Sequence, residues 1–242
     1  MTDPNVRVHE DIRELAGAAA RLFVQEAKEA IGESGRFAVA LAGGSTPKAT
    51  YETLASEYGS PSDLDWNKVH VFFGDERTVG PDHEDSNYRM AREALLSHVS
   101  VGSIHRMRGE LAPPEAASLY EEELTGFFGG PPRLDLVMLG IGDDGHTASL
   151  FPRTAALGVN DGWVVENPVK KLGTTRLTLT APTINVVKRV VFLVAGEGKA
   201  GALKEILEGD EDPRDYPAKL VRLEDGPIWM VDRAATRLLS RH

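Results

Sequence analysis

The chain has 242 residues, a formal net charge of −10 and no cysteine. A chain of this length can bury a core that needs no disulfide or structural metal, and the missing cysteines exclude a disulfide framework, cysteine-ligated metal sites and a cysteine nucleophile. The acidic balance argues against a nucleic-acid-binding or anionic-membrane-binding surface, whereas an anionic small molecule can still bind where cationic side chains gather locally.

The sequence also bears on where the protein works. No apolar run approaches the roughly 20 residues of a membrane span, and the polar, acidic start MTDPNVRVHEDIREL does not resemble a signal peptide. Because a cysteine-free chain suits a reducing compartment, we expect a cytoplasmic protein without a membrane partner.

Apolar periodicity and turn residues divide the chain into alternating helices and strands. In chain order the predicted elements are a helix over 9–31, a strand over 37–44, a helix that starts around Pro47 and ends at 58, a strand over 68–76, a helix over 86–99 capped by Ser86, a helix over 113–128, strands over 134–140 and 176–180, a helix over 181–188, a strand over 190–195, a helix over 197–207, a strand centred on 228–231 and a helix over 232–239.

This alternation predicts an α/β fold of three layers, a mostly parallel, Rossmann-like sheet with helices on both faces. The chain shows no internal repeat and no long linker, so residues 1–242 are expected to form a single domain. Ligands of such folds bind beyond the carboxyl ends of the strands. The residues that follow each strand are therefore the candidates for a functional site.

The first predicted strand is followed by Gly43, Gly44, Ser45 and Thr46, and a helix begins there. Glycines let backbone N–H groups approach a ligand, and a helix N-terminus adds unpaired N–H groups and the positive end of its dipole. These are the properties of a phosphate cradle, although the Walker pattern is absent. A tight strand–helix turn with a Ser or Thr cap explains the same residues equally well.

The second strand leads into Gly74, Asp75, Glu76 and Arg77. Charged residues in this pattern usually form an ion pair at the surface, which contributes little. Their position at the carboxyl end of a strand favours a functional role.

The third strand leads into LGIGDDGHTASLFP (139–152), which allows two interpretations. In the first, Gly140, Gly142 and Gly145 have the spacing of a dinucleotide-binding loop, and Glu166 lies roughly where a ribose-binding acid would stand. In the second, the aspartates and the histidine of this segment form an acid/base cluster at the end of a strand.

Two features favour the acid/base cluster. Asp143 and Asp144 lie inside the loop, where they would repel a pyrophosphate, and Pro152 interrupts the long helix that a dinucleotide loop should open. Histidine titrates near neutrality, and a carboxylate close to His146 could orient its ring and stabilise its charged form. The simpler alternative is a helix-capping aspartate beside a histidine that is satisfied within its loop.

Two further cations complete the candidates. Arg176 opens RLTLT, and Lys199 lies in GEGKAGAL near the start of a predicted helix. Each alone is most simply a solvated surface charge. Together with the loop of Ser45 and Thr46, they would supply the positive patch that an anionic substrate needs on an acidic protein.

Other catalytic patterns are absent from the sequence. There is no H-E-x-x-H pattern and no G-x-S-x-G nucleophile elbow. A hydrolase built on this sequence would therefore activate water rather than form an acyl-serine intermediate. The remaining histidines show no spacing typical of metal ligands, so we expect activity without a metal; they are His9, His70, His83, His98, His105 and His242.

Five motifs, in this order and spacing, closely resemble those of the 6-phosphogluconolactonase family: LAGGSTP, VFFGDERTV, LGIGDDGHTASLFP, RLTLTAPTIN and GEGKAGAL. The resemblance runs from about the first strand to WMVDRAA, nearly the full chain. It implies the fold of glucosamine-6-phosphate deaminases and, more distantly, of ribose-5-phosphate isomerases. It also implies hydrolysis of a sugar-phosphate lactone, 6-phospho-D-glucono-1,5-lactone, in the oxidative pentose phosphate pathway, with no cofactor.

The resemblance implies a role for each candidate. His146 would be the general base that activates water, Asp144 would orient the loop or the imidazole, and Asp75 and Arg77 would line the pocket, with Arg77 close to the carbonyl or the phosphate. The residues that would hold the 6-phosphate are Gly43, Gly44, Ser45, Thr46, Arg176 and Lys199. The resemblance leaves open which of Arg77 and Arg176 binds more of the phosphate, and whether the protein is a monomer or a homodimer.

Three alternative functions remain to be weighed. Glucosamine-6-phosphate deaminases follow the same Asp-Gly-His with a glutamate, in I-A-F-N-E-P, whereas residues 149–152 (SLFP) stand in that place here. A dehydrogenase would bind NAD. A phosphosugar-binding regulator would have lost its chemistry, which the presence of Asp144 and His146 argues against.

Overall fold

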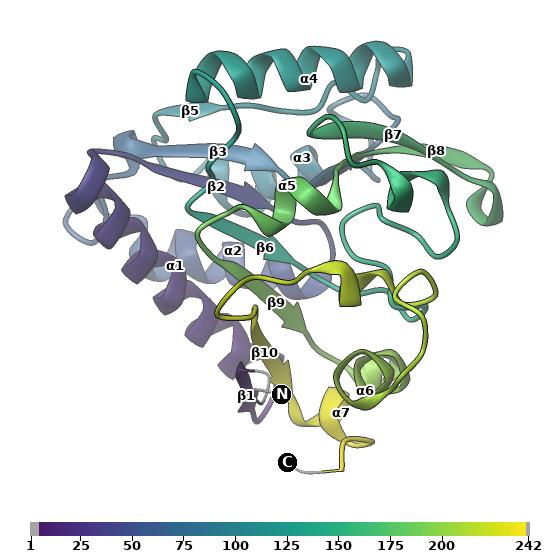
Figure 1. Cartoon of the computed structure of the whole chain (residues 1–242). Helices are drawn as coiled ribbons and strands as arrows, with labels where there is room; N and C mark the ends of the chain where they lie inside the picture. Colours follow the sequence, from purple (N-terminus) through teal and green to yellow (C-terminus); the bar gives the residue numbers. More distant parts are fainter. Residues whose placement is uncertain (1–4, 241–242) are drawn as a thin grey trace.

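The computed structural model describes residues 5–240, and its main sheet consists of seven parallel strands (Figure 1). Across the sheet the strands follow the order β1 (Asn5–His9), β10 (Ile228–Asp232), β9 (Val190–Val194), β6 (Leu136–Leu139), β2 (Phe37–Leu41), β3 (Val69–Phe73) and β5 (Ser103–Ile104). Strands β2, β6 and β9 are buried along their whole length. Burial on both faces explains why their sequences are unbroken apolar runs.

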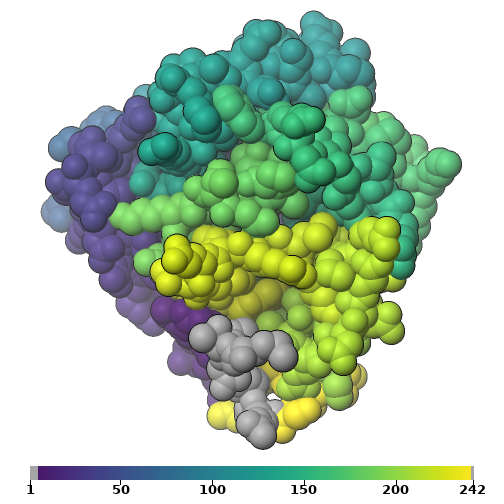
Figure 2. Space-filling model, viewed as in Figure 1, coloured from purple at the N-terminus to yellow at the C-terminus, as the bar shows by residue number. Residues whose placement is uncertain are grey.

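Helices cover both faces of this sheet, as predicted. One core contains residues of α1 (Ile12–Ser34), α2 (Ser45–Tyr58) and α3 (Asn87–Ala91), and the other contains residues of α4 (Pro113–Phe128), α5 (Ala181–Asn185), α6 (Ala200–Glu208) and α7 (Arg233–Thr236). On the face seen in Figure 2, teal, green and yellow segments make up most of the surface, and purple α1 lies along one side.

A second, antiparallel sheet was not predicted. It contains β4 (Asp75–Arg77), β8 (Thr174–Leu179) and β7 (Val164–Val169), in the order β4-β8-β7. Residues 176–180 were predicted as a strand and do form most of β8, but β7 contains Pro168, which disfavours a strand interior. The proline is tolerated because β7 is an edge strand.

Several element boundaries differ from the prediction. The first helix begins at Ile12 rather than residue 9, because Asp11 caps it by accepting hydrogen bonds from the N–H groups of Arg13 and Glu14, both at 2.9 Å, and residues 5–9 pair with β10. The helix predicted over 86–99 consists of α3 followed by a π-helical turn over Arg92–Leu96.

The strand order creates a crevice at the centre of the main sheet. From β2 the chain continues to β3 and β5 on one side, whereas from β6 it continues to β9 and β10 on the other. The carboxyl ends of β2 and β6 therefore flank a topological switch point, where open α/β sheets bind ligands.

Two buried tyrosines form hydrogen bonds with backbone groups at the ends of the strands beside this crevice. The Tyr51 hydroxyl accepts a hydrogen bond from Ala42 N at 2.9 Å and donates one to Ala42 O at 3.0 Å. Tyr120 does the same at Phe73, at 2.8 and 3.1 Å. Both hydroxyls thereby satisfy backbone groups at strand ends, which are costly to leave unpaired in the core.

Over residues 5–240, we find no helix with the length and apolar character needed to cross a membrane.

Candidate active site

A cavity of about 320 Å³ opens at the carboxyl ends of the central strands. Its wall is built from the segments that follow β2 and β6, from β4 and β8, from the turn between β7 and β8, from the start of α3 and from the end of the 3-10 turn Glu197–Lys199 before α6. The residues lining it are Ala42, Gly43, Gly44, Asp75, Arg77, Asn87, Gly140, Ile141, Gly142, Asp143, Asp144, His146, Ala148, Ser149, Phe151, Lys171, Leu172, Arg176 and Lys199.

The cavity brings together most of the site residues predicted from the sequence. Eight of them line it: Gly43, Gly44, Asp75, Arg77, Asp144, His146, Arg176 and Lys199. Ser45 and Thr46 lie at the start of α2 and are not among the lining residues; Ser45 is exposed and Thr46 is buried.

His146 and Asp144 form a hydrogen-bonded pair. The distance between His146 Nδ1 and Asp144 Oδ1 is 2.5 Å, and both side chains are largely buried. The His146 ring also stacks on Phe151, with 4.1 Å between the ring centroids. The imidazole is therefore fixed on two sides, and Nε2 is the ring nitrogen left for a reacting group.

Asp144 accepts two further hydrogen bonds, from His146 N and from Lys171 Nζ, both at 3.3 Å. The hydrogen bond from His146 is the main reason why the pKa of Asp144 lies well below its usual range, and Lys171 adds to this effect. The carboxylate consequently stays ionised in mild acid and can support a positive charge on the imidazole.

The backbone of this loop requires glycine at two positions. A Cβ on Gly142 would lie 2.0 Å from His146 Nδ1, and a Cβ on Gly145, which has a φ of +75°, would lie 2.5 Å from the Tyr216 ring. The glycines thus let the loop fold closely around the imidazole and the neighbouring chain, a role unrelated to a pyrophosphate.

The dinucleotide interpretation fails on the structure of the same loop. The chain passes from it into a 3-10 turn over Ala155–Gly158, so no long helix starts there. Glu166 lies in β7 opposite Leu177 and does not line the cavity.

Asp75 is held between two polar side chains. Its Oδ2 accepts a hydrogen bond from Ser149 Oγ at 2.6 Å, and its Oδ1 accepts one from Asn87 Nδ2 at 3.1 Å. Asn87 also donates to Asp75 O at 3.0 Å, while its own Oδ1 is buried without a partner beside Gly43. These contacts join the segment after β2, strand β4 and the loop after β6 into one polar network.

Glu76 does not form the surface ion pair that its neighbours suggested. It is 2% exposed, and its carboxylate accepts hydrogen bonds from Arg77 N, Asn87 N, Tyr88 N and Ser86 Oγ. Burial raises its pKa, and the backbone donors oppose that rise. Glu76 therefore stabilises the start of α3 and contributes structure rather than chemistry.

Three cationic side chains that line the cavity, Arg77, Arg176 and Lys199, come from β4, from β8 and from the 3-10 turn before α6. Arg77 and Arg176 are direct partners across the antiparallel pair of β4 and β8. Burial lowers the pKa of Arg176, and the positive charge of Arg77 lowers it further. Within the described part of the chain, Arg176 and Lys199 make no ion pair. Two arginines on neighbouring strands, neither of them in an ion pair among the described residues, form a candidate site for an anion.

The start of α2 adds further donors. Its N-cap is Gly44, with a φ of +105°, and no side chain caps this end of the helix. The free N–H groups and the helix dipole therefore favour an anion here.

Sequence reasoning missed three residues of the site. Lys171 lies in the turn between β7 and β8, in a stretch that carries no motif. Asn87 follows the predicted helix cap Ser86 and Ser149 lies inside LGIGDDGHTASLFP, but their contacts with Asp75 join residues 12 and 74 positions apart, which no local pattern indicates.

Among residues 5–240, no group of three or more His, Asp or Glu side chains is arranged to hold a metal ion. Independence from metals stays a prediction that activity measurements must test.

Comparison with known proteins identifies relatives along almost the whole chain. Residues 10–230 match the family described as glucosamine-6-phosphate isomerases/6-phosphogluconolactonase. A 6-phosphogluconolactonase of Synechocystis sp. is 48% identical over 86% of this chain and 86% of its own length, and one of Nostoc sp. is 41% identical over 97% and 98%.

Solved structures with the same fold also match almost the whole chain. The 6-phosphogluconolactonase of Trypanosoma cruzi superimposes with a TM-score of 0.86 at 27% identity, covering 99% of this chain and 98% of its own. A monomeric glucosamine-6-phosphate deaminase, with a TM-score of 0.80 at 24% identity over 97% and 99% of the two chains, shares the fold.

Proposed function

The chain belongs to the family of glucosamine-6-phosphate isomerases and 6-phosphogluconolactonases, and on this premise we propose that it hydrolyses 6-phospho-D-glucono-1,5-lactone to 6-phospho-D-gluconate. This is the second step of the oxidative pentose phosphate pathway. The observation that carries the proposal is that one cavity contains both an imidazole–carboxylate pair and a group of cationic side chains. The relatives named 6-phosphogluconolactonase support the lactone as the substrate.

In the proposed mechanism His146 acts as a general base. Its Nδ1–H donates to Asp144, so Nε2 carries the lone pair that accepts a proton from water. The water oxygen attacks C1 of the lactone and forms a tetrahedral oxyanion. The ring oxygen then leaves and takes the proton from His146, which returns to its neutral form without a covalent intermediate.

The oxyanion requires hydrogen-bond donors before the ring opens. Arg77 and the backbone N–H groups of the glycine-rich loop after β6 are the candidates that line the same cavity. Asp75 supports them indirectly, because its hydrogen bond with Ser149 connects β4 to that loop.

The phosphate of the substrate fits the cationic side of the cavity. Arg176 and Lys199 would make charge-assisted hydrogen bonds to it, and the start of α2, with Gly43, Gly44, Ser45 and Thr46, would add backbone and hydroxyl donors. Holding the phosphate there would fix C1 against the water that His146 activates, so remote binding energy would lower the barrier.

The test is a direct assay of lactone decay. The lactone also opens without an enzyme, so its disappearance is followed with and without the protein, and with the His146→Ala variant as the matched control. We expect the protein to accelerate decay well beyond the background and the variant to lose most of that acceleration. Equal rates in all three samples would disprove the proposed function.

The proposal extends to the state of the protein in the cell. We propose a single-domain, cytoplasmic enzyme that is a monomer or a homodimer and needs neither metal nor cofactor. The absence of cysteine, which suits a reducing compartment, supports the location.

A further inference from the structure

A segment far from the predicted motifs lies directly behind the catalytic histidine. Residues 209–220, here named the strap, connect the end of α6 to the region before β10. Ala218 N donates a hydrogen bond to Gly145 O at 3.0 Å, and the Tyr216 side chain packs so closely on Gly145 that a Cβ there would clash. Gly145 immediately precedes His146, so the strap supports the catalytic loop (residues 140–153) at the position of the imidazole.

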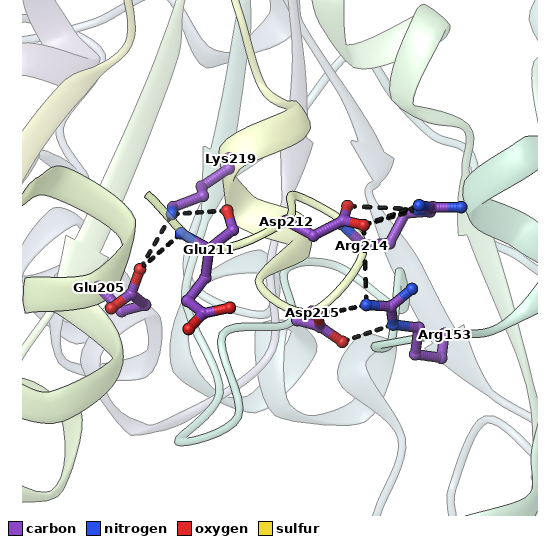
Figure 3. Close-up of polar contacts among 7 residues, drawn as sticks. All are labelled: Arg153, Glu205, Glu211, Asp212, Arg214, Asp215 and Lys219. Atoms are coloured by element: carbon purple, nitrogen blue, oxygen red, sulfur yellow. Dashed lines mark hydrogen bonds and ion pairs between the residues drawn. The ribbon is translucent and has the colours of Figure 1, made fainter. Parts of the chain in front are cut away.

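Lys219, near the last residue of the strap, ties the two ends of the strap together. Its ammonium group, on a side chain only 10% exposed, donates to Glu205 Oε1 at 3.2 Å, to Gly209 O at 3.0 Å and to Glu211 O at 2.9 Å (Figure 3). It also lies 5.8 Å from the centroid of the Tyr216 ring. Lys219 therefore fixes the strap to α6 and helps to hold the tyrosine that contacts Gly145.

The middle of the strap is held by the catalytic loop itself, through a cluster that we name the clamp, formed by Arg153, Asp212, Arg214 and Asp215. Arg153 Nε donates to Asp215 Oδ1 at 2.5 Å, its Nη2 contacts the other oxygen of the same carboxylate, and Asp212 lies 3.6 Å away (Figure 3). The backbone joins in, because Arg153 N donates to Arg214 O at 3.0 Å. The clamp thus ties the end of the catalytic loop to the strap through one backbone bond and a bidentate ion pair.

The backbone of Arg153 explains why such a clamp is needed. Its φ is +56°, and Ala148 in the same loop has a φ of +46°. Non-glycine residues in this left-handed region are strained and persist only where the surroundings hold them. The catalytic loop is therefore a strained segment that the strap holds in shape.

The clamp is connected to His146 through a short path. Arg153 is two residues from Phe151, whose ring stacks on the imidazole at 4.1 Å. From the other side, the strap reaches the residue before His146 through Ala218 and Tyr216. Arg153, Asp215 and Tyr216 do not line the cavity themselves, so they reach the imidazole only through these contacts.

We propose that Arg153 and Asp215 are positioning residues for His146, which act by clamping the strap against the strained catalytic loop. The inference rests on the proposed lactone hydrolysis. We expect this pair to affect kcat and not KM, because the residues proposed to bind the phosphate lie outside the clamp. Arg77 lies on β4, Arg176 on β8 and Lys199 before α6.

The experiment is a charge exchange across the pair. Arg153→Asp places a carboxylate beside Asp212 and Asp215, and Asp215→Arg places a guanidinium beside Arg153 and Arg214, so each single variant repels its neighbours. The double variant restores opposite charges, and aspartate tolerates a left-handed φ better than most residues. Lys188→Ala, which breaks the exposed pair with Glu33 at the amino end of the sheet, is the matched control.

We expect each single variant to lower kcat by roughly fivefold to fiftyfold, the scale of a catalytic group displaced by less than an ångström, with KM within about twofold of the wild type. The double variant should recover most of kcat, and Lys188→Ala should leave both constants unchanged. Wild-type kcat in the single variants, no recovery in the double variant, or a rise in KM that accounts for the loss would each overturn the inference.

A second measurement separates this inference from the proposed function. The ring-proton NMR signals of His146, identified by their absence in His146→Gln, should shift in Asp215→Asn and in Arg153→Gly but not in Lys188→Ala. A wild-type protein that fails to hydrolyse the lactone would overturn the proposed function and leave the positioning role to be judged on these signals. Unshifted His146 signals in both clamp variants would overturn the positioning role whatever the activity.

Discussion

Ser149 Oγ donates a 2.6 Å hydrogen bond to Asp75 Oδ2, and this contact joins strand β4 to the loop that carries His146. Ser149 opens the stretch SLFP, which stands where glucosamine-6-phosphate deaminases have the segment with their relay glutamate. In this chain the position therefore fixes a carboxylate of the cavity wall and supplies no additional acid.

We therefore expect no enzyme-dependent release of ammonia from glucosamine 6-phosphate. Deamination needs an acid that completes a proton relay, and the hydroxyl of Ser149 is engaged with Asp75. The measurement is an ammonia assay at an enzyme concentration that gives rapid lactone hydrolysis. Ammonia release at a rate comparable with lactone hydrolysis would favour a deaminase instead.

Replacing His146 with alanine should lower kcat by roughly 10² to 10⁴, the usual contribution of a general base. Substrate binding should largely survive, because the cations of the phosphate side are untouched. The comparison variant is His98→Ala, an exposed histidine that does not line the cavity. Near-normal kcat in His146→Ala would remove this residue from the mechanism.

Asp144→Asn should lower kcat at least about tenfold, with KM nearly unchanged. The amide cannot replace the negative charge that accepts the proton of His146 Nδ1 and stabilises the imidazolium formed during the reaction. The neighbouring Asp143→Asn is the comparison, because Asp143 lines the cavity but makes no hydrogen bond with His146. If the two variants were equally slow, a general loss of negative charge would explain the effect better than the hydrogen bond does.

Arg176→Ala and Lys199→Ala should selectively lower kcat/KM for the phosphorylated lactone. A charge-assisted hydrogen bond contributes roughly 1.5–3 kcal/mol, so kcat/KM for the phosphorylated substrate should fall about tenfold to a hundredfold in each variant. Unphosphorylated glucono-δ-lactone, measured in parallel, should be affected little, and the exposed Arg108→Ala should change neither. Equal losses on both lactones would mean that these residues act on the carbonyl or through the fold.

Gly43→Ala should destabilise the protein and impair the cavity. An added Cβ would lie 1.9 Å from Asn87 Oδ1, and Asn87 cannot move away freely because its amide donates to both Asp75 O and Asp75 Oδ1. Overpacking of this kind costs about 1–3 kcal/mol, which denaturant titration can measure.

The control for that substitution is Gly126→Ala in α4. Nothing lies within 4 Å of a Cβ at Gly126, so the free energy of unfolding should rise by about 0.5–1 kcal/mol through helix propensity alone. A Gly43→Ala variant as stable and active as the Gly126→Ala variant would show that the predicted clash is relieved without cost.

The sequence alone determined the layers of the fold and selected most of the residues that line the cavity. Buried parallel strands are short apolar runs, and helices show apolar periodicity and capping residues. Both patterns can be read from residues that are close together in the sequence. The residues after β2, β3 and β6 could be selected for the same reason, since carboxyl ends of parallel strands share one edge of a sheet. The resemblance to a known family suggested the substrate and the residue roles that we propose.

Tertiary structure alone decided which groups contact one another. Three contacts depend on the second sheet: Arg77 with Arg176, Ser149 with Asp75, and Lys171 with Asp144. This sheet was not predicted, because β7 contains a proline and therefore lacks the sequence pattern of a strand. The strap could not be predicted either, because its contacts also join residues that are far apart in the sequence. Its contact with Gly145 joins residues about seventy positions apart in the sequence. Only the fold of the intervening chain places Ala218 and Tyr216 behind His146, and no local pattern indicates this.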